Sequence, residues 1–331
     1  MSRKLQAPRW YFGRRPSAPV PFDAPRGPDW AQAEPEYVEA ALARALTRNG
    51  GGWLVVGGVA ALRAEAARAA RAGRAMKRVI AGRELVVWAD AEGLRAAPDR
   101  CPHMGARLSD GHVDEGRLVC PWHGLKLDKR GFREWQCLPT HDDGVLFWVR
   151  MELADEVPTD APILAPRPAD FVSGVIQMVG RCAPEDILAN RLDPWHGAHF
   201  HPYSFRELRV MEKDLDVLRL RVTYRAVGPL GIEVDATFHC PDPRTIVMTI
   251  VDGDGVGSVV ETHATPLDPG RTAMTEATLA TSDRGGWAIA RRFAPIITPL
   301  IQRAARRLWV DDIAYAERRY ALRTGTSAEP A

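Results

Sequence analysis

The sequence predicts an α+β protein of two domains, with an N-terminal all-β domain at residues 51–152 and a C-terminal helix-grip domain at residues 169–325. Two observations support this fold class. Short apolar runs separated by turn residues occupy the first range, and in the second range five further runs precede one long helical pattern. A twisted antiparallel sheet covered by a long helix is an α+β layer that can enclose a cavity.

Residues 1–50 are expected to form an N-terminal arm with one short helix. The first half of the arm is too rich in proline for regular structure, and a helical pattern follows from Tyr37 to Arg48. We interpret the first half as a surface segment.

Length, charge and cysteine content exclude several classes of protein. The chain has 331 residues, with 44 Lys and Arg against 42 Asp and Glu, so the sequence indicates no nucleic acid or acidic partner. No apolar run reaches the roughly 18 residues of a membrane helix, and no signal peptide is visible. Three of the five cysteines, Cys137, Cys182 and Cys240, are expected to be buried or free thiols rather than a disulfide framework. These features favour a cytoplasmic protein.

The all-β domain is predicted from four short apolar runs bounded by turn residues. An Ala- and Arg-rich segment from Leu62 to Arg74 is expected to be one exposed helix. The expected strands are Trp53–Val56, Leu85–Trp88, Gly116–Val119 and Val145–Val149.

Two loops of this domain each combine one cysteine with one histidine. Cys101-Pro-His103 and Cys120-Pro-Trp-His123-Gly are separated by sixteen residues. Cysteine and histidine select a soft metal or an iron–sulfur cluster rather than calcium or magnesium. Zinc is the competing interpretation, but zinc sites usually pair like ligands two to four residues apart. Mixed loops suit a [2Fe-2S] cluster with both cysteines on one iron and both histidines on the other.

The helix-grip domain is predicted from apolar alternation followed by helical periodicity. Its long helical stretch runs from Gly285 to Arg323 and is expected to be interrupted at Pro295 and Pro299. The run from Asp252 to Gly255 favours a hairpin turn over a phosphate-binding loop, because a strand pattern follows it. The expected strands are Val210–Ala226, Ile232–Cys240, Thr245–Val251, Gly257–Thr265 and Thr272–Thr281.

A second candidate metal site contains three histidines within six residues: His196, His199 and His201. Nearby proline and glycine residues disfavour a continuous helix, so helical spacing alone cannot select two of the three. Two histidines and one carboxylate form the facial triad of oxygen-activating non-haem Fe(II). The third ligand must therefore come from elsewhere in the chain.

Both motifs resemble those of one protein family. Cys-Pro-His…Cys-Pro-Trp-His-Gly is similar to the cluster motif of the Rieske non-haem iron oxygenases, the family of ring-hydroxylating oxygenase alpha subunits. Asn-x-x-Asp-x-x-His-x-x-x-x-His, beginning at Asn190, resembles the mononuclear-iron motif of this family. The resemblance implies a Rieske [2Fe-2S] domain and a START-like helix-grip catalytic domain. The strands themselves carry no family signature.

The resemblance also implies a role for each residue that matches these motifs. A carboxylate on the long C-terminal helix would complete the iron site, and Asp312 is preferred over Asp311. Asp193 would be a catalytic bridging residue between a neighbouring subunit's cluster and the iron, and His199, outside the motif, would support or line the site. The implied cluster ligands are Cys101, His103, Cys120 and His123, and the implied Fe(II) ligands are His196, His201 and Asp312.

The function implied by this resemblance is oxygenation. A ferredoxin or an NAD(P)H-dependent reductase would deliver electrons, and O2 would hydroxylate or desaturate a hydrophobic substrate such as a sterol, terpenoid, carotenoid or aromatic compound. The resemblance also implies a homotrimer with electron transfer between subunits. The scarcity of charge from Gly285 to Leu300 suggests a hydrophobic pocket. Two alternatives are an electron-transfer Rieske protein with a non-catalytic ligand-binding domain, and a structural zinc protein.

Overall fold

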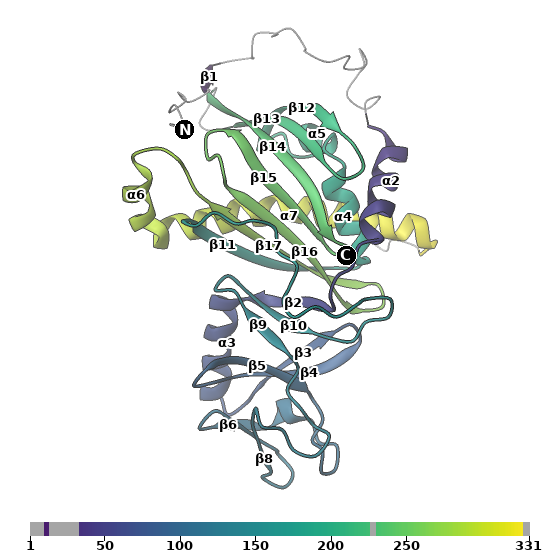
Figure 1. Cartoon of the computed structure of the whole chain (residues 1–331), viewed down its shortest axis with the longest axis vertical. Coiled ribbons are helices and arrows are strands. Elements are labelled where there is room, and N and C mark those ends of the chain that lie inside the picture. Colours follow the sequence, from purple (N-terminus) through teal and green to yellow (C-terminus); the bar gives the residue numbers. More distant parts are fainter. Residues whose placement is uncertain (1–9, 13–32, 226–229, 327–331) are drawn as a thin grey trace.

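The computed structural model describes residues 10–12, 33–225 and 230–326, which form two β-rich parts stacked end to end (Figure 1). The smaller part lies below, and the larger part is one wide sheet with helices behind it. The predicted arm, residues 1–50, lies largely outside the described residues, except for β1 (Trp10–Phe12) and residues 33–50.

The smaller part contains three short antiparallel sheets. They are β2 (Trp53–Gly58), β10 (Leu146–Arg150) and β9 (Thr140–Asp142); β3 (Met76–Ile80), β4 (Arg83–Asp90) and β5 (Gly93–Pro98); and β6 (His112–Asp114), β7 (Arg117–Val119) and β8 (Lys126–Leu127). All four predicted strands are present, as β2, β4, β7 and β10, and the remaining five strands of this part were not predicted. The helix α3 (Val59–Arg71) is not simply exposed as predicted, because Val59, Leu62 and Ala66 are buried in the core of this part.

The larger part is an antiparallel sheet in the order β11-β17-β16-β15-β14-β13-β12, with β1 paired to β14. Its strands are β11 (Val172–Gly180), β12 (Phe205–Lys213), β13 (Leu218–Arg225), β14 (Leu230–Asp242), β15 (Thr245–Gly253), β16 (Val259–Asp268) and β17 (Arg271–Ala280). The prediction of one strand over Val210–Ala226 is wrong, because β12 and β13 form a hairpin. At its turn, Oδ1 of Asp214 accepts the N–H groups of Asp216 and Val217, both at 2.7 Å.

One long helix, α7 (Ala294–Thr324), crosses the face of this sheet behind the strands (Figure 1). It is preceded by α6 (Trp287–Ala290) and a 3-10 turn, η2 (Arg291–Phe293). The predicted interruption at Pro295 and Pro299 is wrong. Pro295 lies in the first turn, where its missing N–H costs no helical hydrogen bond, and the helix continues through Pro299. The α+β helix-grip fold class is confirmed.

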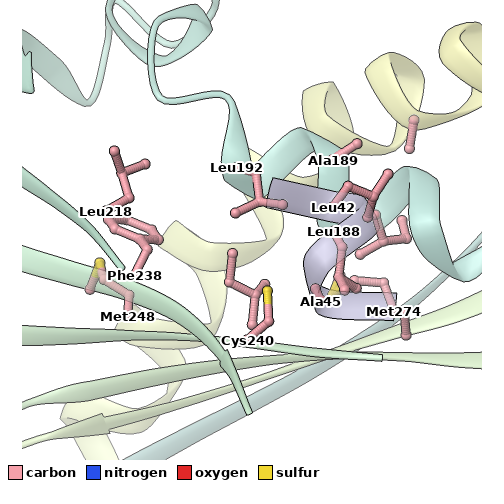
Figure 2. Close-up of a cluster of buried hydrophobic side chains, with 14 of the residues drawn as sticks. Leu42, Ala45, Leu188, Ala189, Leu192, Leu218, Phe238, Cys240, Met248 and Met274 are labelled. Carbon is pink, nitrogen blue, oxygen red and sulfur yellow. The ribbon is translucent and has the colours of Figure 1, made fainter. Parts of the chain in front are cut away.

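Two further helices complete the core between α7 and the sheet. They are α2 (Pro35–Leu46), which overlaps the helical pattern predicted for Tyr37–Arg48 but begins and ends two residues earlier, and α4 (Pro184–Leu192). Figure 2 shows Leu42 of α2 and Leu188 of α4 packed above Met274 and Cys240 of the sheet. Because its residues Ile187, Leu188 and Ala189 are fully buried, α4 is fixed in the core, and the chain leaves it at Asp193.

The two parts share an interface that includes a buried ion-pair network. The Arg167 guanidinium donates to both carboxylate oxygens of Glu261 on β16, each at 2.6 Å, and lies 3.0 Å from Asp143 of the smaller part. The indole N–H of Trp148 also donates to Asp143, at 3.0 Å. A charge in this interior is tolerated because it is paired on both sides.

Within the described ranges, no helix has both the length and the apolar character needed to cross a membrane.

Candidate metal centres

The two cysteine-containing loops have nearly the same backbone structure. In each loop the N–H of the cysteine, Cys101 or Cys120, donates to the carbonyl five residues later, at 2.8 and 2.9 Å. The glycine four residues after the cysteine donates back to the cysteine carbonyl, at 2.9 and 3.0 Å. These glycines, Gly105 and Gly124, have φ angles of +82° and +70°, a conformation that strongly favours glycine. The sequence therefore forms two equivalent turns, which face each other at the tip of the smaller part.

The four predicted cluster ligands divide into an inner and an outer pair. The cysteine side chains are buried, whereas His103 and His123 are exposed and their rings lie 4.8 Å apart. Burial raises the pKa of the Cys101 thiol, and the adjacent Cys120 adds to this effect, whereas the backbone N–H of His103 opposes it. Such N–H groups would stabilise a metal-bound thiolate.

The burial of these four side chains fits a two-iron cluster. Two buried sulfurs and two exposed imidazoles match the arrangement in which each pair binds its own iron.

In the larger part, the side chains of His196, His201 and Asp312 converge. His196 begins the short helix α5 (His196–Phe200), His201 follows its end, and Asp312 lies in the middle of α7. Oδ1 of Asp312 lies 3.2 Å from Nε2 of His196 and 2.8 Å from Nε2 of His201. Bonds of about 2.0–2.2 Å to one ion would place neighbouring donor atoms about 3 Å apart, so the three side chains fit a single metal ion.

Asp312 is held in place by contacts from both α7 and α4. One turn earlier on α7, the buried Trp309 donates its indole N–H to Glu276 of β17 at 2.6 Å, which fixes the helix on the sheet. From α4, the amide nitrogen of the buried Asn190 lies 3.1 Å from Oδ1 of Asp312 and 3.5 Å from Nε2 of His196. Asn190 therefore orients two of the three converging side chains.

The neighbouring Asp311 contacts the opposite side of His201. Oδ2 of Asp311 lies 3.3 Å from Nδ1 of His201 and accepts the Tyr203 hydroxyl at 2.6 Å. The Tyr203 hydroxyl is itself 3.2 Å from Nδ1 of His201, and the Arg307 guanidinium stacks on the Tyr203 ring at 3.8 Å. A carboxylate on the second ring nitrogen fixes the orientation of a ligating histidine.

Asp193 lies beside the same site, immediately after α4. Its Oδ2 accepts the Tyr315 hydroxyl at 3.1 Å and is 3.7 Å from Nδ1 of His196, and its Oδ1 accepts the N–H of Trp195 at 3.1 Å. Burial opposes ionisation, but the contacts with His196, Tyr315 and Trp195 outweigh it and lower the pKa of Asp193. The side chain is therefore an anion in contact with His196.

The two carboxylates also determine the charge of His196 when no metal is bound. Burial lowers the pKa of this imidazole, but Asp193 and Asp312 outweigh burial and raise the pKa to about 9. The pKa of Asp312 is lowered, because both histidines outweigh the effect of its own burial. The site thus favours positive charge, which is the electrostatic condition for binding a cation.

A cavity of about 960 Å³ opens beside Asp193 and His196. His199, Phe200 and Tyr315 line it together with parts of α2 and the C-terminal half of α7. His199 is thus placed on the cavity wall, outside the converging set. The predicted pocket lining from Gly285–Leu300 is wrong for the large apolar side chains of that range, because Ile289, Phe293, Ile296 and Leu300 are 53–63% exposed.

Three residues of this site received no role from the sequence: Asn190, Tyr203 and Tyr315. Asn190 is the first residue of the quoted motif, so its position carried a signal that was not used. Tyr315 follows Asp312 by three residues, which places both on neighbouring parts of one helical face. Tyr203 gave no comparable signal.

Two family profiles match the chain. The Rieske [2Fe-2S] domain matches residues 58–143, and a domain of unknown function, DUF5914, matches residues 153–327. Aminopyrrolnitrin oxygenase PrnD of Pseudomonas fluorescens is 39% identical over 67 residues, which are 19% of this chain and 17% of that protein. The 4beta-methylsterol monooxygenase of Methylococcus capsulatus is 42% identical over 72 residues, or 21% and 18% of the two chains. The chain thus spans less than a fifth of the length of these relatives.

Solved structures match over most of the chain. Dicamba monooxygenase bound to dicamba has a TM-score of 0.58 and 18% identity, covering 87% of this chain and 92% of that one. The terminal oxygenase of carbazole 1,9a-dioxygenase from Novosphingobium sp. KA1 has a TM-score of 0.57 and 18% identity, covering 92% and 91%. At this identity the likeness establishes the fold, and it includes both parts of the molecule. The chain therefore belongs to the DUF5914 family, joins that domain to a Rieske [2Fe-2S] domain, and has the fold of the Rieske oxygenases.

Proposed function

We propose that this chain is the oxygenase component of a Rieske non-haem iron system that hydroxylates or desaturates a hydrophobic substrate. The observation that carries the proposal is the convergence of His196, His201 and Asp312 in a chain that also has a Rieske domain. An electron-transfer protein with a non-catalytic ligand-binding domain has no use for a second site of two imidazoles and a carboxylate. The proposed cluster ligands are Cys101, His103, Cys120 and His123, and the proposed Fe(II) ligands are His196, His201 and Asp312.

An Fe(II) ion bound by two histidines and one carboxylate supplies open coordination positions for activating O2. The contribution of the protein is to fix the donor atoms. Asp311 and Tyr203 hold the His201 ring from its far side, and Asn190 holds Asp312. In hydroxylation, R–H, O2, two electrons and two protons give R–OH and water. In desaturation, the same oxidant and electrons remove two hydrogen atoms from the substrate and give two waters.

We propose that electrons cross between subunits of a homotrimer through Asp193. Figure 1 shows the cluster end, around β6 and β8, at the bottom of the molecule, and α5 near the top. Electron tunnelling falls steeply with distance, which disfavours transfer along the length of one chain. Asp193 lines the cavity beside His196, where the cluster tip of a neighbour can approach. That tip exposes two large apolar side chains, Met104 (62%) and Trp122 (60%), next to the proposed histidine ligands.

The substrate class is inferred from side chains near His201 and from the names of relatives. The ring of Phe205 lies 6.1 Å from His201 and 5.3 Å from Tyr224, and both aromatic residues pack against the apolar core. Relatives that match part of the chain include a 4beta-methylsterol monooxygenase and a pheophorbide a oxygenase. A sterol, terpenoid, carotenoid or aromatic substrate is consistent with these surroundings, and O2 is the co-substrate.

The electron donor is proposed to be a ferredoxin, an NAD(P)H-dependent reductase or both. Two relatives are named as oxygenase components, a term that implies a separate reductase for those proteins. The cytoplasm is the proposed compartment, since NAD(P)H is available there.

Anaerobic purification followed by metal analysis and EPR spectroscopy tests this proposal. We expect about three irons per chain, two of them in a cluster with the EPR signal of a reduced Rieske centre. The reduced protein, with a surrogate reductase and a panel of lipid-soluble substrates, should convert one of them in an O2-dependent reaction. About two irons per chain with an intact cluster signal would support the electron carrier instead. A colourless protein that contains zinc would contradict both the oxygenase and the electron-carrier interpretations.

A further inference from the structure

The helical segment that leads into α7 exposes an unusual apolar stripe. Ile289, Phe293, Ile296 and Leu300 follow one another at steps of four, three and four residues, and their side chains are 53–63% exposed. At about 100° per residue Phe293, Ile296 and Leu300 fall on one face at the start of α7, and Ile289 lies just before them on α6. The buried positions of α7, such as Trp309, fall on the opposite face. Single exposed apolar residues are common, but an aligned stripe of large ones indicates a binding surface.

Positive charge predominates in the sequence that carries this stripe. From residue 284 to 310 the chain has six arginines and no aspartate or glutamate. Arg292, Arg303 and Arg306 are exposed, and none of them forms an ion pair within the described ranges. Arg291 pairs with Asp170. The surface thus combines apolar side chains with unpaired cations along one side.

The segment lies away from the proposed iron site. Figure 1 shows α6 and the start of α7 at the left of the molecule, whereas α2 and α4 lie at the right. A partner bound at the stripe would leave the cavity beside Asp193 accessible to a neighbouring subunit.

We propose that this stripe docks the protein on an anionic membrane surface. Ile289, Phe293, Ile296 and Leu300 would enter the boundary between headgroups and acyl chains, and the flanking arginines would pair with lipid phosphates. A helix with a compact apolar face and basic flanks is the pattern of interfacial membrane binding. The proposal concerns peripheral attachment and does not depend on the oxygenase reaction.

Charge favours the membrane over protein occupants of the stripe. Two copies of the chain meeting through the same stripe would bring like-charged arginines together. Residues 1–32 of the chain are also basic on balance, so they do not complement the surface. An anionic bilayer satisfies both the apolar ridge and the unpaired arginines.

Vesicle sedimentation with the purified, metal-loaded full chain tests the proposal. We expect the protein to pellet with phosphatidylcholine vesicles that contain about 30% phosphatidylglycerol, and to remain in solution with pure phosphatidylcholine. Raising the salt to about 0.5 M should weaken binding severalfold, because it shortens the screening length.

Matched variants distinguish vesicle binding through the stripe from nonspecific binding through other exposed apolar side chains. Phe293→Ser, Ile296→Ser and Leu300→Ser together should weaken partitioning about tenfold or more. The charge variant Arg292→Glu with Arg303→Glu alters only exposed side chains and should also lose anionic-vesicle binding. The control combines Val157→Ser, Val179→Ser and Leu215→Ser, at exposed apolar positions elsewhere (70%, 49% and 47%), and should bind like the parent protein.

A far-UV circular dichroism spectrum and a thermal unfolding midpoint like those of the parent protein check that each variant is folded. The proposal is overturned if the parent protein stays in solution with anionic vesicles, or if both stripe and charge variants bind as it does. It is also overturned if the stripe variant changes the molecular mass measured by light scattering while vesicle binding is unchanged, since the stripe would then be a contact between protein chains.

Discussion

Oδ1 of Asp312 lies 2.8 Å from Nε2 of His201, and both side chains are almost fully buried. The adjacent Asp311 contacts the other ring nitrogen of His201, at 3.3 Å from Nδ1. The acidic pair therefore has two distinct positions relative to one imidazole. Asp312 is placed to bind a metal ion together with His201, and Asp311 is placed to orient the ring.

Substitution of each aspartate by asparagine should separate these roles. Asp312→Asn is expected to lower the iron content from about three to about two per chain, with the cluster EPR signal retained. Asp311→Asn should keep the third iron but bind it about 10- to 100-fold more weakly, because His201 loses its supporting carboxylate. Metal analysis after dialysis against a graded chelator measures both effects. Equal loss of iron from the two variants would show that the division of roles is wrong.

Substitution of Asp193 should stop electron transfer between the two metal centres while both centres keep their iron. Asp193→Ala is expected to retain about three irons but to lose substrate-dependent cluster oxidation in a single turnover. Tyr315→Phe, which removes one hydrogen bond to Asp193, should slow that oxidation about tenfold. Stopped-flow absorbance of the reduced cluster records both rates. Normal cluster oxidation in Asp193→Ala would exclude a bridging role.

The exposed apolar side chains at the cluster tip should control transfer between subunits. Met104→Ser combined with Trp122→Ser is expected to leave the cluster EPR signal unchanged and to slow substrate-dependent cluster oxidation at least about tenfold, because docking of the tip is weakened. The matched control is Phe132→Ser, at a less exposed apolar side chain of the same part (37%). Light scattering should show a smaller assembly for the double variant. If the double variant showed an unchanged rate of cluster oxidation and an unchanged molecular mass, this tip would not be part of the subunit interface.

Glu261 should make the stability of the protein depend on acid pH. Burial raises the pKa of Glu261, but Arg167 and His263 outweigh it and lower the pKa from 4.5 to about 2. Because the folded protein favours the ionised form, this stabilisation is complete above about pH 4.5 and is lost as the pH falls towards about 2. The shift corresponds to about 3 kcal/mol.

Urea unfolding across this pH range measures the effect. Glu261→Gln is expected to lower the free energy of unfolding by about 3 kcal/mol at neutral pH and to show a difference that shrinks in acid. Glu115→Gln, at an exposed side chain (79%), is the control and should differ little at any pH. A pH-independent difference for Glu261→Gln would mean that the ion pair contributes through packing alone.

The cluster loops and the histidine segment could be located from the sequence because their chemistry is local. Cys101 and His103 are two residues apart, and the turn that joins them depends on Gly105 in the same loop. Asp312 could not be located from local sequence alone. It is 111 residues from His201 in the sequence, and the packing of α7 on the sheet brings the two side chains together. The family resemblance supplied that pairing, and the structure shows the physical reason in the bond from Trp309 to Glu276.

Errors in the sequence analysis arose where tertiary packing overrides local preference. Pro299 was expected to interrupt the helix, but contacts on both sides of it fix α7 on the sheet. The Thr298 hydroxyl donates to the Ser173 carbonyl at 2.8 Å, and the Gln302 amide donates to the Val175 carbonyl at 3.0 Å. The scarcity of charge from Gly285 to Leu300 suggested a hydrophobic pocket, but a low charge count cannot distinguish an inward from an outward helical face. Val210–Ala226 was merged into one strand because Leu215 and Val217 continue the apolar alternation through its turn at Asp214.

The ion pairs of Arg167 constrain how this architecture can be rearranged. Arg167 lies in the connector, the segment between β10 and β11. Asp143 belongs to the smaller part, and Glu261 belongs to the sheet. Cutting the chain between these parts, or grafting the cluster domain of a relative onto this sheet, would leave at least one of the three charges buried without its partner. Chimaeric proteins built from this chain should therefore exchange the cluster domain, the connector and Glu261 of β16 together, as one unit.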